Sequence, residues 1–170
     1  MKALVVYESM FGNTERVARA VAEGLAGRVE VETTNVTAAP AVSGVDLLVV
    51  GAPTHAFGLS RPQTRGTAVR QGGSATAAEV GVREWLSRAG RLDGVPVASF
   101  DTRVARPRMP GSAARKAIRL LRRAGGRPVG PPVSFYVTGT PGPLVDGECA
   151  RARAWGELIA ISFQALQRTG

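Results

Sequence analysis

The 170-residue sequence has few of the residues that build metal sites, disulfides or membrane spans. It contains one cysteine and one histidine, which excludes an internal disulfide and argues against a cluster of imidazoles around a metal. Aromatic residues make up only 5% of the chain. The longest apolar run, 45–52, already contains Asp46, whereas a membrane-spanning helix needs about 20 apolar residues.

The amino terminus also lacks the features of a secretory signal. Only five apolar residues, 3–7, precede Glu8. A signal peptide has an apolar stretch of about 7–15 residues followed by a small-residue cleavage site. We therefore expect a cytoplasmic protein, and the length suits one globular domain over 1–170.

Positive charge is concentrated in the middle of the chain. The net charge is +9, and residues 61–127 hold fifteen Lys and Arg against four Asp and Glu. Such a block raises the question of nucleic acid, although only two of the 22 basic residues are lysines and a GC-rich coding sequence produces the same arginine bias. Arg115, Arg119 and Arg122 share one face of an expected helix, and a solvated face is the default interpretation.

Apolar strands alternate with one-sided helices along the sequence. Apolar runs predict five strands at 3–7, 29–34, 45–51, 95–100 and 133–137. Apolar stripes predict four helices around 17–25, 82–89, 114–124 and 155–166, with Trp85 and Trp155 in the core. This rhythm predicts an α/β fold: a doubly wound, five-stranded parallel sheet in the order 2-1-3-4-5, with helices on both faces.

The loop 8–14 follows the first strand and begins the first helix, at the edge where sheets of this order bind ligands. A helix start there presents unpaired N–H groups, Ser9, Asn13 and Thr14 add short polar side chains, and Gly12 lets a ligand approach closely. The loop therefore predicts an anion site, while simple helix capping remains an alternative. The glycine patterns of nucleoside-triphosphate and dinucleotide loops are absent from it.

The loop 51–58 follows the third strand and supplies a rigid turn at Pro53, a hydroxyl at Thr54 and two rings, His55 and Phe57. Both rings can lie against a planar heterocycle, and Phe57 can equally belong to the core. His55 is not expected to act as a general base, because no Cys or Ser nucleophile accompanies it. The two loops together suit a phosphate with a flat ring attached.

With these two loops, Tyr-Glu-Ser-Met-Phe-Gly-Asn-Thr (7–14) and Gly-Ala-Pro-Thr-His-Ala-Phe-Gly (51–58), the chain resembles the small members of the flavodoxin family over almost its whole length. The resemblance implies FMN as cofactor, with its phosphate on the first loop and its ring beside the second. The implied cofactor-binding residues are Ser9, Met10, Phe11, Gly12, Asn13, Thr14, Pro53, Thr54, His55, Ala56, Phe57, Gly58, Asp101, Thr102 and Arg103. Gly58 is the residue expected to turn its peptide toward the reducible nitrogen of the flavin.

The sequence departs from that family in two ways. Flavodoxins usually cover the outer face of the ring with a Tyr or Trp after the fourth strand, and residues 101–111 contain neither, so a more exposed or weakly held flavin is expected. The rim is basic where flavodoxins are commonly acidic, which predicts an anionic redox partner or NAD(P)H. The rim arginines are Arg61, Arg65, Arg70, Arg103, Arg106 and Arg108. The segment 61–78 is expected to be a mobile lid or a solvated linker, and loop-length statistics favour a lid or a binding role.

These features predict an FMN-binding flavodoxin-like redox protein, serving electron transfer or NAD(P)H-dependent reduction of a quinone or flavin, with the chemistry supplied by the flavin. The alternative is a flavodoxin-like interaction module that binds FMN weakly or not at all and uses its basic rim to hold an anionic partner. Nucleic-acid binding is not expected, because no exposed aromatics interleave with the arginines and no recognition helix is evident.

Overall fold

The computed structural model describes residues 1–107 and 110–168, and its centre is a parallel sheet. The strands are β1 (Lys2–Tyr7), β2 (Glu30–Asn35), β3 (Leu47–Pro53), β4 (Pro96–Val104), β5 (Arg127–Pro128) and β6 (Val133–Val137). Their order is β2-β1-β3-β4-β5, and β6 also pairs with β4. The predicted strand order is therefore confirmed.

The fifth position of the sheet is occupied by two short strands rather than one. β5 pairs with the start of β4 at Pro96 and Val97, and β6 pairs with its end, from Phe100 to Val104. Gly130-Pro131-Pro132 separates the two strands. Because proline has no N–H to give to a ladder, this tripeptide interrupts the edge of the sheet.

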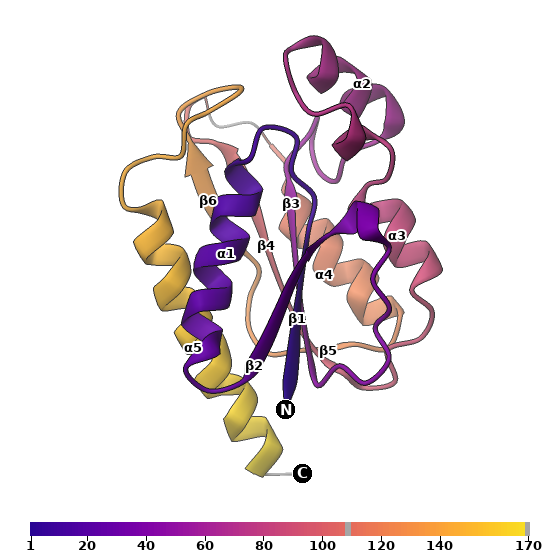
Figure 1. Ribbon diagram of the computed structural model, residues 1–170, viewed down its shortest axis with the longest axis vertical. Coiled ribbons are helices and arrows are strands. Elements are labelled where there is room, and N and C mark those ends of the chain that lie inside the picture. Colours follow the sequence, from indigo (N-terminus) through magenta and orange to yellow (C-terminus); the bar gives the residue numbers. More distant parts are fainter. Residues whose placement is uncertain (108–109, 169–170) are drawn as a thin grey trace.

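Helices cover both faces of the sheet (Figure 1). The longer ones are α1 (Asn13–Ala26), α2 (Pro62–Arg70), α3 (Val82–Arg88), α4 (Ala113–Arg123) and α5 (Glu148–Arg168), with short 3₁₀ turns η1 (Val36–Ala38) and η2 (Thr76–Ala78). α1 and α5 pack on one face, and α3 and α4 on the other. No helix within the described residues is long and apolar enough to cross a membrane.

Side chains of β1 alternate between the two cores, as a strand period of two requires. Val5 joins the core under α1 and α5, while Val6 joins the core under α3 and α4. Both tryptophans are buried, Trp85 in the second core and Trp155 in the first, as predicted. The sheet is thus covered on both sides, and its function must lie at its edges.

Two glycines bring α1 and α5 into backbone contact. A Cβ added to Gly24 would collide with the carbonyl oxygen of Arg153, and one added to Gly156 would collide with that of Val21. Any larger residue at either position would push the helices apart. This contact fixes the position of α1, whose first turn is part of the loop 8–14 that was predicted to bind an anion.

The expectation of a mobile lid or solvated linker at 61–78 is wrong, because the segment forms α2 and η2 and packs against the loop after β1. Met10, Ala68 and Ala77 form a small buried cluster there. The N–H of Ser74 donates to the carbonyl oxygen of Met10 at 2.9 Å. In Figure 1, α2 lies beyond the carboxyl end of β3.

Candidate functional site

A pocket of about 320 Å³ opens at the carboxyl edge of the sheet, where the two predicted loops meet. Eleven residues predicted to hold the cofactor line it. They are Ser9, Met10, Phe11, Asn13, Thr14, Pro53, Thr54, His55, Ala56, Thr102 and Arg103. The structure therefore brings together parts of three loops that are separated by about 40 residues each in the sequence.

The loop before α1 holds a set of backbone donors without acceptors. The N–H groups of residues 9–11 and 13–15 donate no hydrogen bond to any atom in the described part of the chain. Only the N–H of Gly12 is used, and it donates to Ser9 Oγ at 3.1 Å. The first N–H groups of a helix have no partner within it, and a loop that adds further unpaired N–H groups beside them offers a place for an anion.

Gly12 is required in this loop by its backbone conformation rather than by crowding. Its φ is +87°, in the left-handed region, and an added Cβ would meet no atom within 4 Å. A side chain here would thus be strained and would also occupy the space beside the free N–H groups. Gly12 does not line the main pocket but lines an adjoining hollow, which shares Ser9, Met10, Phe11 and Asn13 with it.

The side chains of the loop tie it to the neighbouring strands. Thr14 Oγ1 and Thr102 Oγ1 share a hydrogen bond of 2.7 Å, which links α1 to the end of β4. Asn13 donates from Nδ2 to the carbonyl oxygen of Pro141 at 2.6 Å, and so holds the loop after β6. These bonds close one side of the pocket.

The loop after β3 makes a tight turn at its tip. His55 and Gly58 exchange both backbone hydrogen bonds at 2.8 Å, and the two residues between them, Ala56 and Phe57, have positive φ values of 31° and 77°. His55 and Ala56 line the pocket. Phe57 is 53% exposed, so it is neither core nor part of the pocket lining. The N–H of Gly58 donates to His55, and Gly58 also lies outside the lining.

Asp101 lies away from the pocket, although it was predicted to contact the cofactor. It is fully buried, and its Oδ2 accepts from the Ser112 hydroxyl at 2.6 Å, the Thr54 hydroxyl at 3.0 Å and the Ala114 N–H at 3.0 Å. Thr102, the next residue in the strand, faces the pocket instead. Asp101 thus anchors the start of α4 and the loop after β3.

Two further walls of the pocket come from outside the predicted cofactor-binding residues, and one of them belongs to the segment 61–78, for which a lid or a binding role was favoured. One wall is α2, which contributes Thr64, Thr67 and Ala68, together with Gln71 just after the helix. The other is the end of β4, with β6 and the loop that follows it. This second wall consists of Val104, Val137, Gly139, Thr140 and Pro141. The pocket is therefore enclosed on two sides without an aromatic lid.

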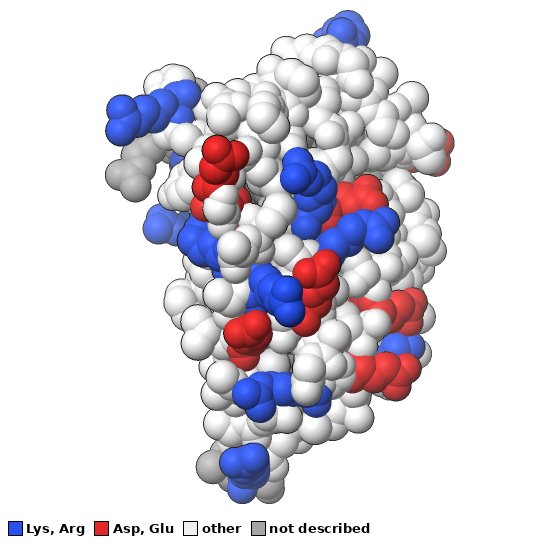
Figure 2. Space-filling model, turned by 60° about the vertical axis from the view of Figure 1, so that its left-hand side comes forward, with Lys and Arg blue, Asp and Glu red and all other residues white. Residues whose placement is uncertain are grey.

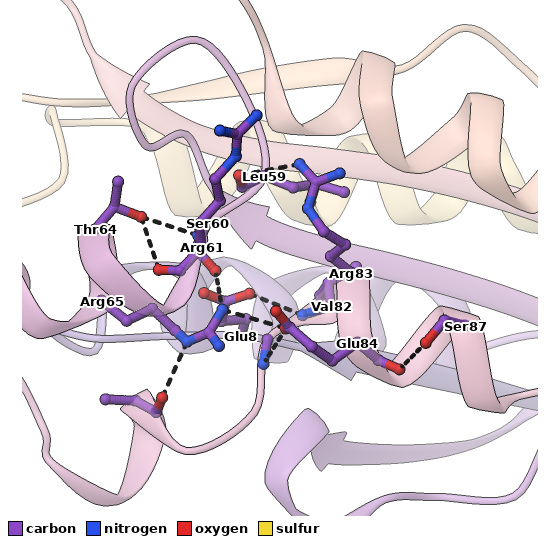
Figure 3. Close-up of polar contacts among 12 residues, drawn as sticks. Glu8, Leu59, Ser60, Arg61, Thr64, Arg65, Val82, Arg83, Glu84 and Ser87 are labelled. Atoms are coloured by element: carbon purple, nitrogen blue, oxygen red, sulfur yellow. Dashed lines mark hydrogen bonds and ion pairs between the residues drawn. The ribbon is translucent and has the colours of Figure 1, made fainter.

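A buried guanidinium holds α2 in place (Figure 3). Arg65 is 1% exposed, and it donates from Nε to the carbonyl oxygen of Ala78 at 3.0 Å and from Nη1 to Ser60 Oγ at 2.9 Å. It also pairs with Glu84 Oε2 of α3 at 3.2 Å. The prediction that Arg65 belongs to the basic rim is wrong, because its guanidinium is buried and pairs with Glu84 inside the molecule.

Glu8 lies in the same buried cluster, one residue before the ligand loop. Its Oε2 accepts from the N–H of Val82 at 2.9 Å, whereas its buried Oε1 has no partner among the described residues. Burial raises the pKa of Glu8, and the hydrogen bonds from Ser60 and Val82 and the charge of Arg65 only partly oppose it. Glu84, although burial acts against it, has a lowered pKa because of its bonds to the backbone and to Arg65.

His55 is neutral under ordinary conditions. Burial lowers the pKa of its imidazole, the positive charge of Arg65 lowers it further, and a hydrogen bond with the backbone of Thr64 opposes both. A neutral ring at the pocket wall can pack against an apolar, planar ligand without adding charge.

No family model matches the sequence, and no curated protein matches it. Solved structures do match over nearly the whole chain. A flavodoxin from the domain Archaea is 20% identical, with 96% of this chain and 99% of that chain covered and a TM-score of 0.69. Flavodoxin 1 from Bacillus cereus is 19% identical, with 97% and 98% covered and a TM-score of 0.68.

The chain has the flavodoxin fold. A WrbA-like flavodoxin protein from Agrobacterium tumefaciens shares it more distantly, with 18% identity, 96% and 98% of the two chains covered and a TM-score of 0.58. The expected fold and strand order are thus confirmed by the comparison as well as by the sheet. The pocket described above lies at the carboxyl edge of this flavodoxin fold, at the switch point between β1 and β3.

Proposed function

We propose that the chain binds FMN in this pocket and serves as a flavin-dependent electron carrier. The observation that carries the proposal is the set of unpaired N–H groups at residues 9–11 and 13–15, because residues 9–11, 13 and 14 line the pocket. The structural similarity to flavodoxins supports the same cofactor. When bound, the flavin would supply the redox chemistry.

The remaining tasks belong to residues of this chain. The loop before α1 would hold the phosphate with backbone dipoles and the hydroxyls of Ser9 and Thr14, since the loop contains no Lys or Arg. Thr64 and Thr67 of the α2 wall, Val104 and the imidazole of His55 would contact the ring.

The size of the pocket favours electron transfer over reduction of a bound small molecule. A volume of about 320 Å³ lies at the low end of the range for ligand pockets, which is roughly 300–1,000 Å³. Such a pocket suits one flat ligand better than a flavin with a substrate stacked on it.

The test compares two glycines with the same backbone requirement. Gly12 and Gly44 have φ values of +87° and +72°, and an added Cβ meets no atom within 4 Å at either one. Gly12→Val and Gly44→Val should therefore lose similar stability. Only Gly12→Val should lose FMN, because only its side chain lies beside the free N–H groups.

FMN binding is measured by quenching of flavin fluorescence. The absorbance spectrum of the protein after it has been mixed with FMN reports uptake directly. Wild type and Gly44→Val should bind FMN, and riboflavin, which lacks the phosphate, should bind at least about tenfold more weakly. Equal FMN affinity in the two valine variants, or equal affinity for FMN and riboflavin, contradicts the proposal.

A further inference from the structure

Helix α4 carries a surface of positive charge that the molecule does not neutralise. Over 11 residues it has five cations and no acid. These cations are Arg115, Lys116, Arg119, Arg122 and Arg123, here called the α4 basic face. None of the ion pairs among the described residues involves any of them.

The helix geometry places this charge on the outside. Ala114, Ala117, Ile118 and Leu121 are buried against the sheet, while the four arginines are exposed. Arg115, Arg119 and Arg122 follow each other at helical spacings of four and three and form one row. Like charges so close together repel, so the row lowers the stability of its own helix and gains nothing from the rest of the chain.

The other helix layer is arranged differently. α1 and α5 carry both signs, and each helix has an internal ion pair: Arg19 with Glu15 at 2.7 Å, and Arg151 with Glu148 at 2.6 Å. Figure 2 shows blue and red side chains alternating on that side of the molecule. The excess is largest on α4, which has five cations and no acid, whereas α2 has two arginines and no acid.

The α4 basic face reaches the mouth of the candidate flavin pocket. The aliphatic part of the Lys116 side chain packs against Gly58, so that a Cβ on that glycine would collide with it. Gly111, just before α4, packs in the same way against the backbone of Phe57. Phe57 is 53% exposed at the tip of the turn whose neighbours, His55 and Ala56, line the pocket. One cation of the α4 basic face, Lys116, thus lies beside the turn that carries the exposed Phe57.

We infer that the α4 basic face, with Phe57 at its pocket end, docks an acidic electron-transfer protein that exchanges electrons with the bound flavin. This inference rests on the proposed function. A positive surface steers an anionic partner and orients it, and an exposed aromatic gives the contact a desolvated centre. In the reaction the partner loses one electron, the flavin gains it, and the oxidised partner leaves.

The surface fits a protein better than a nucleic acid or a membrane. The α4 basic face has no aromatic among its cations on which bases could stack, and a single exposed phenylalanine is a weak anchor for a lipid surface. Its position beside the pocket serves a partner that must bring a redox centre close to the flavin. Neither a nucleic acid nor a lipid needs that position.

The experiment measures the reduction of the FMN-loaded protein by a reduced acidic [2Fe–2S] ferredoxin in a stopped-flow instrument, over a range of ionic strength. The test variant replaces Arg115, Arg119 and Arg122 by Gln. A matched control replaces Arg28, Arg153 and Arg168, which are exposed and lie away from α4, and it removes the same amount of charge. A third variant, Phe57→Ser, removes the ring alone.

We expect the wild-type rate to fall steeply with added salt. The α4 variant should be about tenfold slower or more at low salt and should show a flatter salt dependence, because steering changes association rates by about 10–10³. The control should stay within about twofold of wild type. Phe57→Ser should slow the reaction at every salt concentration.

Parallel salt slopes for wild type and the α4 variant overturn the docking site. Titrations with duplex DNA and with phosphatidylserine vesicles accompany the series, and binding of either one that depends on α4, without a change in the ferredoxin rate, overturns it as well. FMN quenching and reduction by dithionite are measured for every variant. Failure of the wild type to take up FMN contradicts the proposed function, whereas normal uptake with unchanged ferredoxin rates contradicts the docking alone.

Discussion

The helices on the two faces of the sheet use their charged residues in opposite ways. On α1 and α5 several cations pair with an acid one turn away, as Arg19 does with Glu15 and Arg151 with Glu148. The cations of α4 have no acid on their helix and no ion pair within the described residues. Paired charge contributes to the folded structure, and unpaired charge lowers its stability. The net charge of a protein therefore says little about its binding surfaces until the paired charges have been separated from the unpaired ones. Four predictions test which charged residues of this chain are paired.

The largest effect is expected inside the molecule, at the fully paired Arg65. Replacing it by Met leaves Glu84 without its cation and removes the bonds to Ser60 and Ala78. Breaking a buried ion pair costs about 3–5 kcal/mol, so the free energy of unfolding should fall by that amount. FMN affinity should fall too, because α2 loses its anchor.

Urea unfolding measures the change in Arg65→Met. The control is Arg70→Met on the same helix, where the side chain is exposed and the expected change is about 0.5 kcal/mol or less. Similar losses in both variants contradict the view that Arg65 is a structural cation.

A smaller loss is expected for the paired Arg151 of α5. Its guanidinium donates to both oxygens of Glu148 at 2.9 and 2.6 Å and to the carbonyl oxygen of Ser134, and it lies 4.4 Å from the centre of the Phe135 ring. Because the side chain is partly exposed, solvent screens the pair, and Arg151→Met should lower the free energy of unfolding by about 1–2 kcal/mol.

The Arg151 prediction also has a pH signature. Burial acts to raise the pKa of Glu148, but the bonds from Arg151 and from the Tyr136 N–H outweigh it and hold the pKa below its usual value. A lowered folded-state pKa stabilises the protein above the unfolded value and loses that stabilisation as the pH falls through the folded one. Acid unfolding should therefore be less pH-dependent in Arg151→Met, and an unchanged pH profile contradicts the assignment.

Glu8, the carboxylate that lacks a full set of partners, should show the opposite pH dependence. Because its folded-state pKa is raised, its contribution is greatest below the unfolded value of about 4.3 and is lost as the pH rises through the folded value. Glu8→Gln imitates the neutral form. Its stability relative to wild type should increase with pH, and denaturant titrations from pH 4 to pH 8 measure the difference.

The smallest effect is expected on α4, and its sign is reversed. Arg119→Gln relieves like-charge repulsion from Arg115 and Arg122, so it should raise the free energy of unfolding by about 0.2–0.5 kcal/mol at low salt and by less at high salt. The matched change on α1, Arg19→Gln, removes a paired cation and should not stabilise the protein. If both Arg119→Gln and Arg19→Gln stabilised the protein, the proposed difference between unpaired charge on α4 and paired charge on α1 would be contradicted.

Strand and helix positions with strong apolar patterns could be predicted from the sequence. β1 and β3 are continuous apolar runs, and the apolar stripes of α1 and α5 face the core as expected. α2 could not be found in this way, because its buried residues are Arg65 and Ala68 and its exposed ones are equally polar. Its helix is held by hydrogen bonds from a guanidinium, and these leave no periodic apolar signal.

The candidate site was predictable where a loop joins a strand directly to a helix. Residues 9–14 and 53–56 were placed correctly at the carboxyl edge because parallel strands end there together. Asp101 and Phe57 lie outside the pocket lining for local reasons: Asp101 bonds to the start of α4, and Phe57 is exposed at the tight turn 55–58. The predicted rim residue Arg108 lies outside the described residues.

The glycine contact between α1 and α5 also constrains how the protein is made. Gly24 meets the backbone of α5 at Arg153, about 130 residues later in the chain. A ribosome therefore finishes the loop before α1 long before it makes the helix that fixes α1 from behind. We expect a nascent chain that ends before Glu148 to lack an ordered anion site, so that the cofactor joins only after α5 has emerged.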